Sequence, residues 1–139
     1  MAQGTTTFLT ALDTARVLPS NMDSSEAAIL AMQAHRGILR TAAADGAISP
    51  AAGEVVLTKE TAGAYTLAAP ASDGFRLCIT SGTAAAHVVT ATGLIEDGVT
   101  GGAKDTMTFA AFPGASIDLL AYDGKWHVVA KNVVTVAAA

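Results

Sequence analysis

From residue 54 onward, short runs of β-branched and aromatic residues alternate with turn signals, and this pattern restricts the chain to a β fold. Asp-Gly occurs four times, at Asp45, Asp73, Asp97 and Asp123. The pair tolerates the positive φ of tight turns. We therefore expect a mainly β fold, a small antiparallel β-sandwich or barrel, over residues 46–139. Its strands are EVVLTK (54–59), AYTLAA (64–69), FRLCITS (75–81), AHVVTAT (86–92), TMTFAAF (106–112), SIDLLAY (116–122) and KWHVVAK (125–131), with VVTV (133–136) as an added edge strand.

The pair Asp123-Gly124 lies between two of these runs and predicts a two-residue hairpin turn. Because side chains alternate across a sheet, the hairpin has one wholly apolar face that should belong to the core. That face comprises Ile117, Leu119, Ala121, Trp126, Val128 and Ala130. The opposite face is mixed, and it is either solvated or an interface with a polar rim. Its candidates for contact between subunits are Leu120, Tyr122, His127 and Val129.

Residues 1–45 lack this alternation of strands and turns, and we interpret them as an extended N-terminal arm followed by one short α-helix. Pro19 and Asn21 break any helix in the arm, whereas Asp23 and Glu26 form a capping pattern for a helix that Gly37 ends. The arm has no periodicity and cannot form a core of its own, so its apolar side chains need another surface. The candidate contacts with a shell or a neighbouring subunit are Phe8, Leu9, Leu12, Val17, Leu18, Ile29 and Met32.

The composition argues against several classes of partner. Lys and Arg number only 8 and the formal net charge is -4, which is a poor match to nucleic acid. No apolar run approaches the roughly 20 residues of a membrane helix, and the N-terminus lacks the pattern of a secretory signal. Charged residues make up 14 %, below the usual ~25 % of soluble domains. A protein with so few charged residues often has much of its surface covered by other subunits.

The residues that could carry chemistry do not form a recognisable pattern. His35, His87 and His127 lie far apart and lack the spacing of a metal site, so the two strand histidines read as members of half-exposed sheet faces. Cys78 alternates with apolar neighbours and reads as a partly buried, inert thiol. The segment 97–105 reads as a surface loop. We expect no enzymatic activity, no metal and no cofactor.

Three segments resemble small structural proteins of tailed bacteriophages, in particular head decoration (cement) proteins and related virion β modules. They are LAAPASDG (67–74), TAAAHVVTATG (83–93) and GASIDLLAYDGKWHVV (114–129), and the resemblance covers about residues 53–136. The resemblance implies no catalytic residues.

The resemblance implies a capsid decoration protein that binds the outside of the major capsid shell and stabilises it. It further implies a homotrimer, the major capsid protein as partner, and a place on the virion surface after assembly in the host cytoplasm. The alternative is a tail-fibre or other virion-surface module that binds a host receptor or glycan, for which Phe112 and Tyr122 are the aromatic candidates.

Overall fold

The computed structural model describes residues 38–139, which contain strands and no helix. The mainly β fold class is confirmed, as a single, nearly closed barrel-like sheet. The predicted arm and helix, with Phe8, Leu9, Leu12, Val17, Leu18, Ile29 and Met32, lie outside the described residues. The strands are β1 (Leu39–Ala42), β2 (Gly46–Ile48), β3 (Gly53–Leu57), β4 (Ala64–Leu67), β5 (Arg76–Ser81), β6 (Val88–Glu96), β7 (Lys104–Phe109), β8 (Ser116–Tyr122), β9 (Lys125–Asn132) and β10 (Val134–Ala137).

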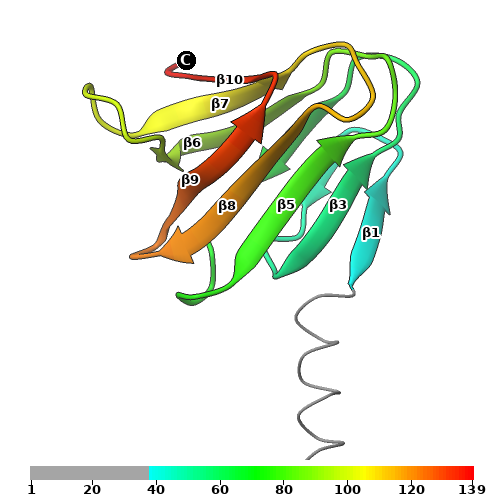
Figure 1. Cartoon of the computed structure of the whole chain (residues 1–139). Coiled ribbons are helices and arrows are strands. Elements are labelled where there is room, and N and C mark those ends of the chain that lie inside the picture. Colours follow the sequence, from blue (N-terminus) through cyan, green and yellow to red (C-terminus); the bar gives the residue numbers. More distant parts are fainter. Residues whose placement is uncertain (1–37) are drawn as a thin grey trace, which may run out of the picture. The chain divides into compact units, whose positions relative to one another are not determined.

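The strands follow the order β1-β3-β5-β8-β9-β6-β4-β2, and β7 and β10 extend the sheet beyond β6. In Figure 1, β1, β3, β5 and β8 lie side by side across the front of the domain. The predicted antiparallel pairing is found at β5–β8, β8–β9, β6–β7 and β7–β10. The other pairs are parallel. The reason is that strands β1 to β6 do not pair with their neighbours in sequence, but alternate between two sides of the barrel.

This alternation also changes the role of two Asp-Gly pairs, at Asp45 and Asp73, whereas Asp97-Gly98 lies in the loop between the paired strands β6 and β7. All four glycines have a positive φ, as the sequence predicts, but only Asp123-Gly124 forms a two-residue hairpin turn, with φ of 53° and 72°. Asp45-Gly46 leads from β1 into β2, which do not pair with each other. Both strands were missed by the sequence pattern, and β1 lies within the range 1–45 assigned to the arm and helix.

The core fills the inside of the barrel, and Trp126 is its largest fully buried side chain. The indole Nε1 donates a hydrogen bond of 2.9 Å to the carbonyl oxygen of Ala68, and the ring packs against Phe75 at 6.2 Å between centroids. This confirms that Trp126 belongs to the core. Around it lie Val55, Leu57, Tyr65, Leu67, Leu77, Ile79, Val89, Ile95, Met107, Phe109, Ile117 and Leu119.

The β8–β9 hairpin matches the predicted register near its turn and departs from it further out. Ala121 pairs with Trp126 and Leu119 with Val128, as predicted. A β-bulge then shifts the register, so that Ile117 pairs with Lys131 and not with Ala130. The extra residue on β9 reverses the alternation of its side chains. The prediction that Ala130 is buried is therefore wrong, and Ala130 is exposed.

No helix among residues 38–139 has the length and apolar character needed to cross a lipid bilayer.

Candidate functional site

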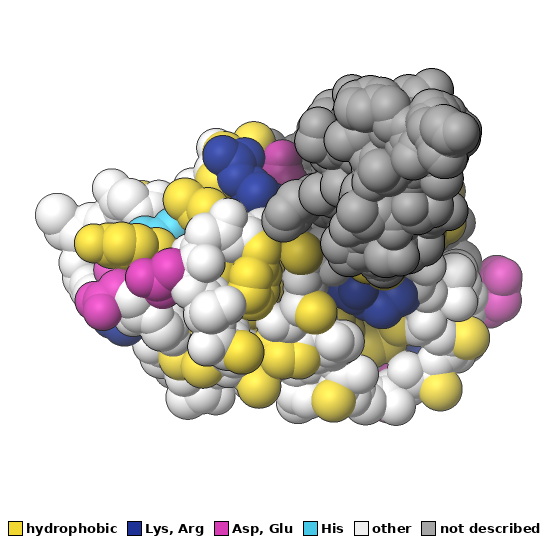
Figure 2. All heavy atoms as spheres, turned by 90° about the horizontal axis from the view of Figure 1, so that it is seen from below, with side chains coloured by type: hydrophobic (Ala, Val, Ile, Leu, Met, Phe, Trp, Pro, Cys, Tyr) yellow, Lys and Arg dark blue, Asp and Glu magenta, His cyan; other side chains and the backbone are white. Residues whose placement is uncertain are grey.

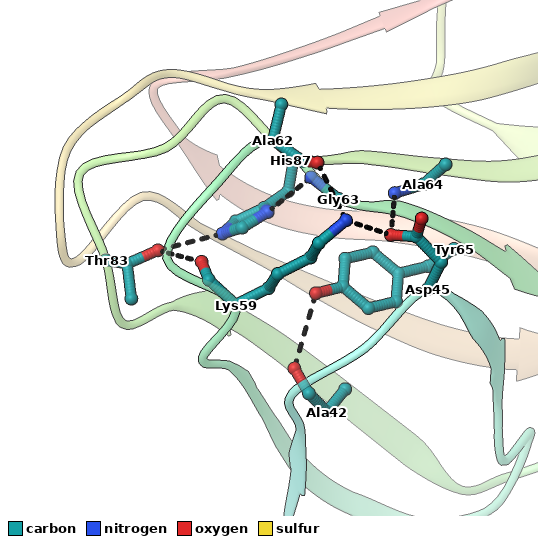
Figure 3. A network of polar contacts seen from close by, with 9 residues as sticks. All are labelled: Ala42, Asp45, Lys59, Ala62, Gly63, Ala64, Tyr65, Thr83 and His87. Atoms are coloured by element: carbon teal, nitrogen blue, oxygen red, sulfur yellow. Dashed lines mark hydrogen bonds and ion pairs between the residues drawn. The ribbon is translucent and has the colours of Figure 1, made fainter.

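The most strongly organised polar cluster of the described domain is centred on His87, which lies directly before β6 and is fully buried (Figure 3). The backbone N–H of Gly63 donates to Nδ1 of the imidazole at 3.1 Å. On the other side of the ring, Nε2 and Oγ1 of Thr83 are 3.0 Å apart, and the Thr83 hydroxyl donates to the carbonyl oxygen of Lys59 at 2.8 Å. The cluster therefore ties the loop after β3 to the loop before β6.

These contacts decide which nitrogen carries the proton. Nδ1 faces a backbone donor and must accept, so the neutral ring carries its proton on Nε2 and donates to Thr83. Burial, and then the positive charge of Lys59, lower the pKa of His87. Both ring nitrogens have a partner, so the imidazole acts as a structural link between two loops. The prediction that His87 lies on a half-exposed sheet face is wrong, because its ring turns inward before the strand begins.

A second set of contacts surrounds the first (Figure 3). Nζ of Lys59 lies 2.8 Å from Oδ1 of Asp45 and donates to the carbonyl oxygen of Ala62 at 3.2 Å. The same Asp45 oxygen accepts from the backbone N–H of Ala64 at 3.0 Å. The hydrogen bond from Lys59 and then that from Ala64 lower the pKa of the Asp45 carboxyl. Asp45 thus joins the loop between β1 and β2 to the start of β4, and Lys59 joins that same loop to the loop before β4.

Tyr65 connects this network to the core. Its ring packs edge-on against His87 at 5.7 Å between centroids, and its hydroxyl donates to the carbonyl oxygen of Ala42 at 3.3 Å. Burial raises the pKa of the Tyr65 phenol. The hydrogen bond to Ala42 spans the side of the barrel where β1 and β2 leave the sheet open, so Tyr65 helps to hold its two edges together.

The residues predicted as a face between subunits lie on the outside of the β8–β9 hairpin. Leu120 pairs directly with His127, and the rings of Tyr122 and His127 meet edge to face at 5.6 Å between centroids. Tyr122 is 58 % exposed, whereas Leu120 and His127 are half-buried. Val129 is exposed at the bulge. The structure therefore places Leu120, Tyr122 and His127 together, and their contact with another subunit stays a prediction.

Cys78 opens onto a shallow hollow of about 150 Å³ on the outer side of the sheet, which is lined by Cys78, Ser116, Ile117, Asp118, Ala130, Lys131 and Asn132. The thiol is half-buried, as the sequence predicts, and its Sγ lies 3.8 Å from Oγ1 of Thr80. Burial is the main cause of a raised pKa of the Cys78 thiol. A thiol with a raised pKa is a weak nucleophile at neutral pH.

The remaining exposed apolar side chains are spread over the surface of the domain. The view from below shows hydrophobic side chains in small groups across the face, with the acidic side chains mainly at its margins (Figure 2). Phe112, in the loop between β7 and β8, is 65 % exposed. The loop between β6 and β7 is largely exposed and carries Val99, but it is shorter than the predicted loop 97–105, because Lys104 and Asp105 already belong to β7. Within residues 38–139, no three His, Cys, Asp or Glu side chains come close enough to share a metal ion.

No protein-family model matches the sequence, and no curated protein matches it at a significant level.

Proposed function

We propose that this protein is a virion structural protein, a capsid decoration protein that binds the outside of the major capsid shell and stabilises it. The proposal rests on the positions that the three phage-like segments occupy in the fold. The segment 114–129 forms the β8–β9 hairpin, and its Trp126 donates to Ala68 in the segment 67–74. The segment 83–93 supplies both Thr83 and His87 of the buried network.

The resemblance therefore includes residues that determine the three-dimensional structure of the domain. These segments supply a buried tryptophan, its backbone acceptor and a buried histidine link, beside exposed positions such as Ala69 and Ala71. This supports descent from such a β module. The domain also presents exposed apolar side chains beside few charges, which suits packing among other subunits.

In this proposal the protein forms a homotrimer through the outer face of β8 and β9, with Leu120, Tyr122, His127 and Val129 at the contact. The apolar residues of the arm, among them Phe8, Leu9 and Leu12, bind the shell or a neighbouring subunit. Each fully buried side chain of this size stabilises a contact by roughly 1.5–3 kcal/mol. Repetition around a symmetric lattice multiplies modest affinities through avidity.

The test uses shells that lack decoration protein and the full chain at increasing concentration. We expect saturable binding in a fixed ratio to the major capsid protein, and shells that resist heat and low salt better once decorated. The triple change Phe8→Ser, Leu9→Ser and Leu12→Ser should lower the apparent affinity for the shells at least about tenfold, which corresponds to about 1.4 kcal/mol. The control is Val99→Ser, which alters an apolar side chain on a loop of the β domain. If the triple variant decorates the shells as fully as the wild type, the arm is not the anchor. If the wild-type chain does not bind the shells, the decoration role is wrong.

The exposure of Phe112 and Tyr122 favours one alternative, a tail-fibre or other virion-surface module that binds a host receptor or glycan. Aromatic faces at the surface are suitable platforms for sugar rings. Electron microscopy of virions labelled with an antibody to this chain separates the two roles, because decoration predicts label over the head and receptor binding predicts label on the tail. Loss of host-cell binding in Phe112→Ala would support the alternative.

A further inference from the structure

The outermost strand of the sheet, β10, has one edge that no described strand covers. β10 pairs with β7 in antiparallel register, with Thr135 opposite Thr108 and Val136 opposite Met107. Among the strands of residues 38–139, it has no partner on its other side. In Figure 1, β10 follows the margin of the sheet beside β7. A strand edge of this kind presents backbone donors and acceptors to another chain.

The hydrogen bonds to β7 show which residues face that free edge. The backbone N–H of Ala110 donates to the carbonyl oxygen of Val133 at 3.0 Å, and the Thr106 hydroxyl donates to that of Ala137 at 3.3 Å. In an antiparallel ladder, residues that bond to one neighbour alternate with residues that point away from it. Val133, Thr135 and Ala137 therefore point toward β7. Val134 and Val136 direct their N–H and C=O groups to the free edge.

The other two edges of the sheet carry features that hinder pairing with another chain. β1 contains Arg40, whose guanidinium donates to the carbonyl oxygens of Ala51 and Ala52. β2 is three residues long and is followed closely by Pro50. Charge, proline and short length are the usual protections of an edge strand. β10 is four residues long, like β1, but it carries neither a charge nor a proline, since VTVA is uncharged and rich in β-branched residues.

We propose that β10 pairs with β10 of a second copy of this chain, in antiparallel register across a two-fold axis at Thr135. This register places Val134 of each copy opposite Val136 of the other, so that four backbone hydrogen bonds form from the outward groups. The exposed Thr135 side chains face each other across the axis, a favourable cross-strand pair.

The charges next to β10 favour the antiparallel arrangement of two identical chains. Lys131 lies three residues before the start of β10 and is exposed. At its other end, Oδ2 of Asp105 accepts from the backbone N–H of Ala139 at 2.8 Å. Antiparallel pairing brings the Lys131 end of one copy to the Asp105 end of the other, whereas parallel pairing would bring like charges together. Complementary charges of this kind set register and exclude wrong partners.

The test measures self-association of the full chain by sedimentation up to about 1 mM, where even contacts of about 4 kcal/mol are detected. Thr135→Lys and Thr135→Glu each place like charges opposite each other at the axis. Each should weaken self-association at least about tenfold. An equimolar mixture of the two variants should associate again as a heterodimer. The matched control is Thr66→Lys, which adds the same charge to an exposed position of β4 and should leave association unchanged.

A second variant removes the pairing without adding charge. Val136→Pro deletes an outward N–H in each copy and leaves the ladder to β7 intact, and proline is tolerated on edge strands. It should weaken association as Thr135→Lys does, with an unchanged circular dichroism spectrum. The proposal is wrong if the wild-type chain stays monomeric at 1 mM. It is also wrong if every associated species of the wild-type chain survives both charge variants, since a trimer through β8 and β9 would survive them but pairs of β10 strands would not, or if mixing the variants restores nothing. Loss of association in Leu120→Ser alone would place the contact on β8 and β9. The proposal is independent of the virion role.

Discussion

The backbone N–H of Gly63 donates to Nδ1 of His87 over 3.1 Å, and this contact keeps the buried imidazole neutral. A proton added at Nδ1 would set two donors against each other inside the protein, where neither can turn to water. The charged groups that face the cluster are the ammonium of Lys59, which opposes a second positive charge, and the carboxylate of Asp45, which Lys59 already neutralises. Protonation of His87 should therefore destabilise the folded domain at acidic pH.

We expect the free energy of unfolding to fall as the pH drops below about 6.5, the ordinary pKa of histidine. The pKa of His87 is lowered in the folded state, so the unfolded chain takes up the proton first. The contribution of neutral His87 is fully present above that pH, and is lost as the pH falls toward the folded pKa. Its slope is at most about 1.4 kcal/mol per pH unit. Urea denaturation between pH 7.5 and 5 measures this, and His87→Gln should remove the dependence. His127→Gln is the matched control and should keep it.

Gly63→Ala should destabilise the domain by about 1–3 kcal/mol, the usual cost of overpacking. A Cβ on Gly63 would lie 2.6 Å from Cε2 and 2.7 Å from the hydroxyl of Tyr65, whose buried ring has no space to move. The backbone at Gly63 is not left-handed, so the cost is steric. Thermal unfolding measures the effect. Ala62→Gly changes the neighbouring exposed position and should cost less than half as much. Equal stability of Gly63→Ala and wild type would show that Tyr65 does not pack on Gly63.

Trp126→Ala should destabilise by about 3–5 kcal/mol, because it removes the largest core side chain and leaves the Ala68 carbonyl without its donor. Trp126→Phe keeps most of the apolar volume and should cost less. Tyr122→Ala, on the exposed side of the same hairpin, is the comparison, and we expect less than about 1 kcal/mol for it. Chemical denaturation monitored by circular dichroism applies to all three. A loss below 1 kcal/mol in Trp126→Ala would contradict its place in the core.

Asp105→Ala should loosen the end of the chain at β10 and the bend of β6. One carboxylate oxygen of Asp105 accepts from the N–H of Ala139, and the other accepts from that of Gly93 at 2.6 Å. These two bonds lower the pKa of the Asp105 carboxyl below 3.8. We expect faster amide hydrogen exchange at Gly93 and Ala139 in the variant, and carboxyl titration below pH 3.8 in the wild type. Asp118→Ala, on the outside of β8, should leave exchange at both positions unchanged.

The eight strands expected from residue 54 onward all form, because alternation and turn chemistry are local and can be read within one segment. The Asp123-Gly124 hairpin is the clearest case, since a two-residue loop sets the register of the strands on both sides. The place of Trp126 in the core follows from that register. The edge position of β10 was also predicted, because VVTV follows the hairpin as a last short run.

Only the tertiary structure decided which strands became neighbours. The strands β1 to β6 alternate between two sides of the barrel and pair in parallel with partners distant in sequence, and no local pattern encodes that choice. The bulge that exposes Ala130 arises where β9 pairs with β8, and no turn or alternation signal in the sequence marks it. The inward turn of His87 depends on Gly63, 24 residues earlier, which supplies the donor. Local signals therefore determined the elements of this protein, whereas its barrel and its buried histidine arise from contacts that exist only after the chain has closed on itself.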